Sequence, residues 1–361
     1  MASFAAASEI LGGAVLDGAF PACAIEVGTR EGALWRRAFG SLTYDAGAPP
    51  ASIDTIFDLA SLTKVLATTT LAMRAVDEGR LSTSDPVSRW IPAWRGRDRE
   101  EVTIADLLAH ASGLTAYLPF FRDCTGRIEF ERAICSLPLE YRPRTQSLYS
   151  DLGFILLGGV VELLAQLPLD RFVHERIVRP LGLRSTAFVD LTQLRTRRIA
   201  TVPDVIAPTE RCPWRGKVLC GEVHDDNAWA MGGVAGHSGL FANAADVDTL
   251  AGRLLGCLRG RDDFVPQEIV REFWTKDGTA EDSTWALGWD TPSATTSSAG
   301  GRMSRHAVGH LGFTGTSIWI DLDRDLRVTL LTNRTHPRRD NERIRDARPR
   351  IHDAVMEVFG T

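Results

Sequence analysis

Strand-like segments lie at both ends of this 361-residue chain, and helical signals fill most of the residues between them. Residues 21–28 and 33–43 read as two strands around the turn-forming segment 29–32. Near the other end, residues 316–321 and 326–333 alternate around a polar turn, which predicts a hairpin. This distribution favours an α+β fold, an α/β sandwich in which both ends of the chain build one antiparallel sheet.

Helices are predicted on either side of these strands and throughout the middle of the chain. The first 20 residues place apolar side chains on one helical face: Ile10, Leu11, Val15 and Leu16. A long helix is predicted from Ser61 to Glu78, and a closing helix over 351–359. We therefore expect a sheet domain of residues 1–80 and 285–361, flanked by terminal helices. Residues 81–284 are expected to form an inserted, mainly helical domain, with the active site in the cleft between the two.

Composition excludes several classes of protein. With 44% hydrophobic and 24% charged residues the chain is globular, and a net charge of −5 makes nucleic acid a poor partner. No apolar run approaches the roughly 20 residues of a membrane span, and Met1–Ala7 lacks the basic residues of a secretory signal. We therefore expect a cytoplasmic protein. The six cysteines form no C-x-x-C pair, so neither a zinc site nor a disulfide framework is indicated.

Lysine is scarce, which draws attention to the few that are present. Only Lys64, Lys217 and Lys276 are lysines among the 41 basic residues. A lysine in an arginine-rich chain is a candidate for a role that requires losing a proton. Lys64 follows Ser61 as S-x-x-K at a predicted helix start, so the hydroxyl and the amine share a face. A neutral Lys64, its pKa lowered by burial, could accept the Ser61 proton; alone, however, the tetrad fits a serine N-cap followed by a chance lysine.

Two later segments carry further candidate groups. Tyr149 precedes Ser150 and Asp151 at the start of an apolar helix, where it could relay protons beside Lys64 or simply be a half-buried tyrosine. The segment Gly309–Thr316 has three glycines, which allow a ligand to approach a strand edge closely. A free N–H at Phe313 would pair with that of Ser61 to form an oxyanion hole, and the alternative is a glycine-rich turn.

Together these motifs resemble the serine β-lactamase superfamily, which includes class C β-lactamases, related penicillin-binding proteins and esterases of the same fold. The family order is S-x-x-K, then Y-x-N or a variant, then K-T-G or H-x-G on a strand. Here these correspond to Ser61–Lys64, Tyr149–Asp151 and His310–Gly312. Further similarity lies in segments flanking these motifs: Phe57–Lys64, Thr103–Leu114, Gly236–Asp246 and Ala286–Trp289.

The resemblance implies roles for these residues. Ser61 would be the acylated nucleophile, and Lys64 and Tyr149 would share the acid–base work. The backbone at Ser61 and Phe313 would hold the oxyanion, and His310 and Gly312 would line the substrate site. The reaction would be acyl transfer through an acyl-enzyme followed by hydrolysis, with no metal or organic cofactor.

Two departures from the family pattern affect the expected substrate. Asp151 stands where β-lactamases have Asn; an ionised carboxylate only accepts hydrogen bonds and favours a protonated Lys64. His310 replaces the lysine of the third motif, and a neutral imidazole attracts a substrate carboxylate less strongly. Both changes argue against an efficient β-lactamase and favour an esterase, or an amidase or peptidase of cell-wall fragments.

Three other polar segments are given no catalytic role. His224, Asp225, Asp226 and His237 match no metal-site spacing and are expected to be polar loop residues that line the cleft. The arginine-rich segment Arg334–Arg350 also contains acidic residues, which is typical of a solvated face. The stretch Thr291–Arg305 is polar and has no assigned role.

The sequence thus predicts a serine hydrolase acting on a small-molecule ester, amide or muropeptide. A weak β-lactamase or a D-Ala-D-Ala carboxypeptidase-like enzyme is the alternative within the family. Transfer of the acyl group to an acceptor other than water shares the same intermediate. A non-catalytic ligand-binding protein of the same fold is the alternative from another class. The oligomeric state does not follow from the sequence.

Overall fold

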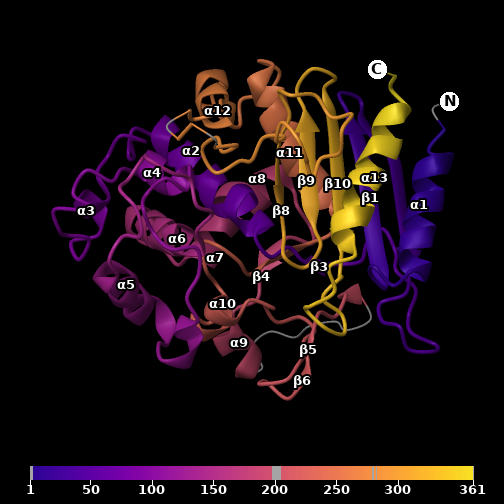
Figure 1. Cartoon of the computed structure of the whole chain (residues 1–361), viewed down its shortest axis with the longest axis horizontal. Coiled ribbons are helices and arrows are strands. Elements are labelled where there is room, and N and C mark those ends of the chain that lie inside the picture. Colours follow the sequence, from indigo (N-terminus) through magenta and orange to yellow (C-terminus); the bar gives the residue numbers. More distant parts are fainter. Residues whose placement is uncertain (1–2, 197–204, 279, 282, 361) are drawn as a thin grey trace.

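A five-stranded antiparallel sheet forms the centre of one half of the molecule (Figure 1). The computed structural model describes residues 3–196, 205–278, 280–281 and 283–360. The strand order is β2-β1-β10-β9-β8. The strands are β1 (Ala22–Thr29), β2 (Gly32–Gly40), β8 (Val308–Leu311), β9 (Ser317–Asp321) and β10 (Leu326–Thr332). Both ends of the chain contribute to this sheet, so the predicted α+β fold is confirmed.

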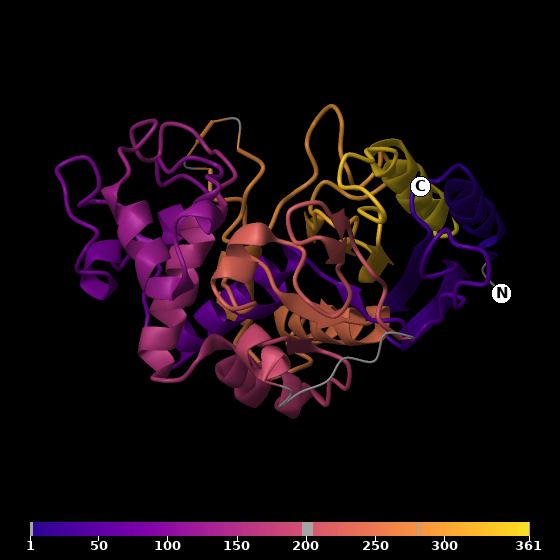
Figure 2. The ribbon, with the colours of Figure 1, turned by 90° about the horizontal axis from the view of Figure 1, so that it is seen from below.

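Helices cover both faces of the sheet (Figure 2). The terminal helices α1 (Ala5–Leu16) and α13 (Ile344–Glu357) pack together on one face, and α11 (Ala244–Leu258) packs on the other. Alternate residues of β1 serve the two faces: Ile25 and Val27 join the core beneath the terminal helices, whereas Ala24 joins the core on the side of α11. Strand β1 is therefore buried on both faces, whereas β2 at the edge of the sheet is largely exposed.

The terminal helices differ in detail from the sequence prediction. Leu11 of α1 is buried as expected, but Leu16 is 89% exposed. Five residues after Leu11, Leu16 lies about 140° away around the helix, so it faces solvent. The closing helix α13 begins at Ile344 rather than at residue 351 and contains Pro349.

The central helix begins at the predicted place. It runs over residues 62–77, with a π-helical part over Lys64–Thr69 followed by α2 (Thr70–Asp77). It is preceded by β3 (Phe57–Asp58), which pairs with β7 (Leu240–Ala242) and so forms a small sheet with β4 (Ala187–Phe188). The strand and the helix meet at Ser61.

The segment between β3 and β8 is mainly helical. Its remaining helices are η2 (Phe120–Arg122), η3 (His174–Val178), α3 (Val87–Trp90), α4 (Ile104–Leu108), α5 (Gly126–Ser136), α6 (Asp151–Ala165), α7 (Leu169–Val173), α8 (Arg179–Leu181), α9 (Leu191–Arg195), α10 (Asp226–Ala230) and α12 (Gln267–Trp274). A short hairpin is formed by β5 (Arg211–Cys212) and β6 (Lys217–Val218). The expected division at residues 80 and 285 stays a prediction, and residues 197–204, 279 and 282 within it lie outside the described residues.

Helix α6 brings the second motif to the centre of the molecule. Ser150 caps its N-terminus by accepting a hydrogen bond from the N–H of Gly153. Gly158 of α6 lies so close to Gly236 that a Cβ on Gly158 would be 2.8 Å from the Gly236 Cα. This close contact of two backbones, which only glycines allow, sets Asp151 beside the segment that follows Gly236.

No single helix in the described ranges is long and apolar enough to cross a membrane. One pair, Asp151–Ala165 with Leu169–Leu181, reaches that length only when the two are joined across a 71° bend.

Candidate active site

Ser61 lies at the start of the central helix, directly after a tight turn. The buried carboxylate of Asp58 accepts hydrogen bonds from the N–H of Ala60 at 2.9 Å and of His224 at 2.7 Å. Ala60 has a φ of 47°, which is uncommon for a residue with a Cβ, and such strained positions cluster at functional sites. The turn presents the Ser61 side chain at the N-terminus of a helix, where partial positive charge favours an anion.

Lys64 is fully buried, and its amine lies within hydrogen-bonding distance of three oxygen atoms. Nζ is 3.0 Å from Ser61 Oγ, 2.7 Å from Asp151 Oδ1 and 3.1 Å from the carbonyl oxygen of His237. Burial alone would lower the pKa of Lys64, but Asp151 and Tyr149 outweigh it and raise that pKa above its usual value. The direction of this shift agrees with the expectation that Asp151 favours a protonated Lys64, and it runs against the alternative of a neutral amine whose pKa is lowered by burial.

Tyr149 lies just before α6, and its phenol contacts both Ser61 and Lys64. The Lys64 amine is 4.9 Å from the centre of the Tyr149 ring. His110 and Trp285 pack against the same ring, with centroids 4.7 and 5.5 Å away. Burial raises the pKa of Tyr149, although Lys64 opposes the rise, so the phenol keeps its proton at neutral pH.

His110 fixes the backbone on either side of Tyr149. Its Nδ1 accepts a hydrogen bond from the N–H of Ser150 at 3.1 Å, and its carbonyl oxygen accepts one from Leu148 at 2.9 Å. Burial, and then the charge of Lys64, hold the pKa of His110 well below its usual value, so the ring is neutral. Sequence reasoning missed this role, because nothing along the chain connects residue 110 with residue 150.

The turn 312–316 docks directly on the segment that precedes Ser61. Thr314 Oγ1 donates to the carbonyl oxygen of Asp58 at 2.7 Å, and Thr316 Oγ1 donates to that of Leu59 at 3.0 Å. In the described part of the chain, neither the N–H of Ser61 nor that of Phe313 donates a hydrogen bond to the protein. Both N–H groups are therefore free to bind a ligand oxygen, as the predicted oxyanion hole requires.

His310 lies on strand β8 beside Tyr149, with ring centroids 6.0 Å apart. Its Nδ1 is 2.8 Å from the carbonyl oxygen of Leu311. Because a carbonyl oxygen only accepts, Nδ1 carries the proton and Nε2 is an acceptor; within the described residues Nε2 has no partner. Burial, reinforced by Lys64, lowers the pKa of His310 to about 3, which leaves the ring neutral.

A cleft of about 920 Å3 opens onto these groups. Of the seven predicted site residues, six line the cleft: Ser61, Tyr149, Asp151, His310, Gly312 and Phe313. Lys64 lies beneath the floor and reaches the cleft through Ser61. The structure therefore brings together residues that the sequence separates by more than 200 positions.

Gly312 offers a test of the turn geometry. A Cβ at this position would lie 2.0 Å from Thr316 Oγ1 and 2.5 Å from the carbonyl oxygen of Leu59. We expect Gly312→Ala to displace the Phe313 N–H and to lower kcat for ester hydrolysis by roughly 100-fold, the usual consequence of about 1 Å of misplacement. Gly13→Ala in α1, where nothing lies within 4 Å of the new Cβ, is the control and should retain wild-type kcat. A Gly312→Ala variant with wild-type kcat would contradict the assigned oxyanion hole.

The arginine-rich segment also contributes to the cleft, which the sequence interpretation missed. Arg334 and Arg348 line it and are only 8% and 6% exposed, so the predicted solvated face is wrong at these positions. Arg348 lies four residues after Ile344 and three before Ile351, on the apolar stripe of α13. This spacing would have predicted a buried Arg348 if the predicted helix had begun at Ile344 instead of at residue 351.

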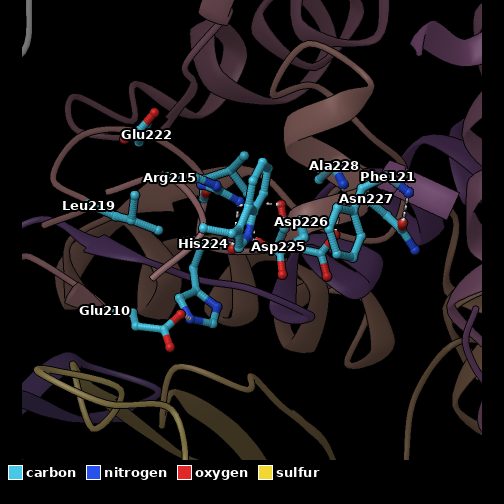
Figure 3. A network of polar contacts seen from close by, with 12 residues as sticks. Phe121, Glu210, Arg215, Leu219, Glu222, His224, Asp225, Asp226, Asn227 and Ala228 are labelled. Atoms are coloured by element: carbon cyan, nitrogen blue, oxygen red, sulfur yellow. Dashed lines mark hydrogen bonds and ion pairs between the residues drawn. The ribbon is translucent and has the colours of Figure 1, made fainter. Parts of the chain in front are cut away.

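Residues 224–226 line the cleft, as expected, and Figure 3 shows their network of polar contacts. His237, predicted to line the cleft with them, is instead 1% exposed and lies behind Asp225. Asp226 pairs with Arg215 at 2.7 Å and with Arg339 at 3.1 Å, and His224 Nε2 is 3.3 Å from Glu210. Burial would raise the pKa of Asp225, but His237 at 3.0 Å outweighs it and holds that pKa below its usual range. Among the described residues no group of three His, Cys, Asp or Glu side chains is arranged to hold a metal ion.

Comparison with known proteins places the chain in a family. The family model for beta-lactamase matches residues 7–351. A "Putative D-alanyl-D-alanine carboxypeptidase" of Salmonella gallinarum (strain 287/91 / NCTC 13346) is 33% identical over 318 residues, covering 79% of this chain and 71% of that protein.

Solved structures show the same fold at lower identity. EstCE1, a hydrolase with promiscuous acyltransferase activity, has a TM-score of 0.78 at 20% identity and covers 97% of both chains. Unliganded simvastatin synthase (LovD) from Aspergillus terreus has a TM-score of 0.74 at 19% identity and covers 98% of both chains. These neighbours support the fold, and the family follows from the model match and the Salmonella relative. The chain belongs to the beta-lactamase family.

Proposed function

We propose that this protein is a serine hydrolase that cleaves an ester or amide through an acyl-enzyme on Ser61. The observation that carries the proposal is the position of Lys64 Nζ, which is hydrogen-bonded to both the Ser61 hydroxyl and the Asp151 carboxylate. A serine alone is a weak nucleophile, and a base within hydrogen-bonding reach is what activates it.

In the acylation step, Ser61 Oγ attacks the substrate carbonyl carbon and loses its proton. Because Lys64 is already protonated, its amine accepts this proton only as it passes another to Asp151, 2.7 Å away. The C–O bond forms, and the carbonyl oxygen becomes an oxyanion that the N–H groups of Ser61 and Phe313 stabilise.

The intermediate then collapses and the bond to the leaving group breaks. Tyr149 gives its proton to the leaving oxygen or nitrogen and takes one from Lys64, which recovers its own from Asp151. All three groups thereby return to their resting state. In deacylation, water attacks the acyl-enzyme and loses a proton to the same groups. Ser61 takes a proton back as the bond to the acyl group breaks and the acid is released.

The neutral state of His310 bears on the substrate. A lysine there would carry a full charge, whereas burial lowers the pKa of the His310 imidazole to about 3, and its Nε2 is an acceptor without a partner among the described residues. The neutral His310 therefore supports an ester or amide substrate whose recognition does not depend on a cation in the third motif. For the same reason we expect a β-lactam to be a poor substrate.

A second candidate function is that of a D-Ala-D-Ala carboxypeptidase or peptidoglycan-fragment peptidase. It is favoured by the name of the Salmonella relative, which shares 33% of the aligned residues. A third candidate function is transfer of the acyl group to an alcohol or amine. It is suggested by EstCE1, which shares the fold and is described as a hydrolase with promiscuous acyltransferase activity.

The test is a comparison of substrates under one set of conditions. We expect measurable hydrolysis of p-nitrophenyl esters, little turnover of nitrocefin, and amide cleavage of a muropeptide only if the peptidase function holds. Added alcohols should divert the acyl group if transfer competes with hydrolysis. A protein that turns over none of these substrates and forms no covalent adduct would instead be a ligand-binding member of the family.

A further inference from the structure

One carboxylate in the cleft differs from the others in having no cation beside it. The other four that line the described cleft all form ion pairs: Asp151 with Lys64, Asp225 with His237, Asp226 with Arg215 and Arg339, and Glu342 with Arg345. Asp290 lines the same cleft and is half-buried, but no basic side chain among the described residues forms an ion pair with it. Because a charge removed from water is costly without a partner, Asp290 is a candidate for binding a cation that enters the cleft.

The two oxygens of this carboxylate differ in their contacts. Oδ1 of Asp290 accepts hydrogen bonds from Thr284 Oγ1 at 2.6 Å and from the N–H of Thr291 at 2.9 Å, which hold the side chain in place. Oδ2 accepts no hydrogen bond from the part of the chain that the structure describes. Burial raises the pKa of Asp290 to about 6, and the groups that oppose this rise are Thr284 and Thr291 rather than a cation. At pH 7.5 the carboxylate is therefore ionised and has one oxygen free to accept.

Backbone pairing places Asp290 beside the third motif. Its N–H donates to the carbonyl oxygen of Gly309 at 2.8 Å, and the N–H of Gly309 donates to the carbonyl oxygen of Asp290 at 2.9 Å. Gly309 lies on β8 directly before His310, whose ring packs beside Tyr149. In the proposed mechanism Tyr149 gives its proton to the leaving group. Asp290 therefore lies on the leaving-group side of Ser61.

Trp285 adds an aromatic ring next to this carboxylate. Trp285 and Asp290 are partners in an antiparallel bridge, and the side chains of such partners lie on the same side, with Cβ atoms about 4.5–5.5 Å apart. Both residues line the cleft. The Trp285 ring also stacks on the ring of Tyr149, with centroids 5.5 Å apart, so it lies between the carboxylate and the catalytic phenol. A carboxylate beside an indole suits an organic cation, because one offers a charge-assisted hydrogen bond and the other a cation–π contact.

We propose that Asp290, with Trp285 beside it, binds an ammonium group in the leaving group of the substrate. This inference rests on the proposed hydrolase function and specifies its substrate class: esters or amides whose leaving group carries a primary amine, which is protonated at neutral pH. Oδ2 of Asp290 accepts one N–H of the ammonium, and the ring of Trp285 packs against it. The other carboxylates of the cleft do not serve this role, because each already has a cation.

A matched pair of esters tests the proposal by changing the charge of the leaving group. The pair is 4-(2-aminoethyl)phenyl butanoate and 4-(2-hydroxyethyl)phenyl butanoate. Two methylene groups separate the amine from the aromatic ring, so the two phenols are similar as leaving groups. We expect the wild-type kcat/KM at pH 7.5 to be roughly 10- to 100-fold higher for the ammonium ester, the range of one charge-assisted hydrogen bond.

Asp290→Asn should bring the ratio of the two kcat/KM values close to unity, because the amide keeps the size of the side chain and loses its charge. The ratio is taken within one protein, so a general loss of activity in the variant does not affect it. Asp54→Asn, at an exposed aspartate outside the cleft, makes the same change in net charge and should keep the wild-type ratio. A wild-type ratio near unity, or an unchanged ratio in Asp290→Asn, would overturn the proposal.

A binding measurement separates this inference from the hydrolase function. In the Ser61→Ala protein, which lacks the proposed nucleophile, 4-(2-aminoethyl)phenyl butanoate should raise Tm more than its hydroxyl analogue, and adding Asp290→Asn should remove that difference. If no protein hydrolyses either ester but this difference is present, the hydrolase function fails and the ammonium site stands. If the wild type hydrolyses both esters and the difference in Tm is absent, the ammonium site fails and the hydrolase function stands.

Discussion

Replacing Ser61 with Ala is expected to lower kcat/KM for p-nitrophenyl butanoate by about 10^3- to 10^6-fold, the range seen when a serine nucleophile is removed. The hydroxyl is the only group in the proposed mechanism that bonds to the substrate, so no neighbour can replace it. Residual activity would come from the oxyanion hole and from binding alone. Steady-state kinetics on purified wild-type and variant protein measure the effect.

The control for this variant is Ser136→Ala at the end of α5, where the carbonyl oxygen of Ala133 is the hydroxyl's one partner among the residues that the structure describes. It should keep wild-type activity. Because Ser61 accepts one hydrogen bond from Lys64, the Ser61→Ala protein should fold and show a cooperative unfolding transition. Activity within tenfold of wild type in Ser61→Ala would mean that another residue is the nucleophile.

Replacing Asp151 with Asn is expected to lower kcat by about 10^2- to 10^4-fold at pH 7, the usual contribution of general acid–base catalysis. The amide has nearly the same shape but cannot take a proton from Lys64, so the proton relay from Ser61 is interrupted. In the variant only a deprotonated Lys64 can act as the base. The residual activity should therefore rise with pH, and a pH–rate profile of both proteins measures this.

The same substitution should reverse the pH dependence of stability. In the wild type the pKa of Lys64 is raised, so its stabilising contribution is present below the unfolded-state value of about 10.4 and is lost as pH rises through the folded-state pKa. In Asp151→Asn, burial is the dominant influence and should depress the pKa of Lys64. The variant should then gain stability as pH rises. Its free energy of unfolding should be about 3–5 kcal/mol below that of the wild type at pH 6, and this deficit should be smaller at pH 9.

Asp248→Asn is the matched control because it breaks the buried ion pair with Arg327, whose side chains are 5% and 7% exposed. An arginine does not lose its proton in this pH range. The loss in free energy of unfolding of Asp248→Asn should therefore be the same at pH 6 and pH 9, and this variant should retain activity. Urea unfolding at the two pH values measures all three proteins. Equal deficits for Asp151→Asn at both pH values, with wild-type activity, would contradict the assigned roles of Asp151 and Lys64.

Local spacing was enough to predict part of the site. Ser61 and Lys64 lie three residues apart on a helix, so their contact follows from helix geometry. The antiparallel sheet also followed from local alternation in the terminal segments. Tyr149 and His310 required the order of the motifs, because no local signal says that residues 149 and 310 meet at residue 61.

Other features depend on long-range packing and could not be predicted from the sequence. The protonation of Lys64 depends on a 2.7 Å contact with Asp151, which outweighs burial. The role of His110 depends on a hydrogen bond to Ser150 across two segments. The burial of Arg348 depends on α13 beginning at Ile344, and Pro349 within that helix obscures its start.

The most direct test of the proposed function is covalent labelling with a fluorophosphonate, followed by peptide mapping. The reagent should phosphonylate the wild-type protein once, on the peptide that contains Ser61, and excess ester substrate should slow the labelling. Ser61→Ala should stay unlabelled. A label on a different residue, or the absence of any label on a protein that still hydrolyses esters, would contradict the assignment of Ser61 as the nucleophile.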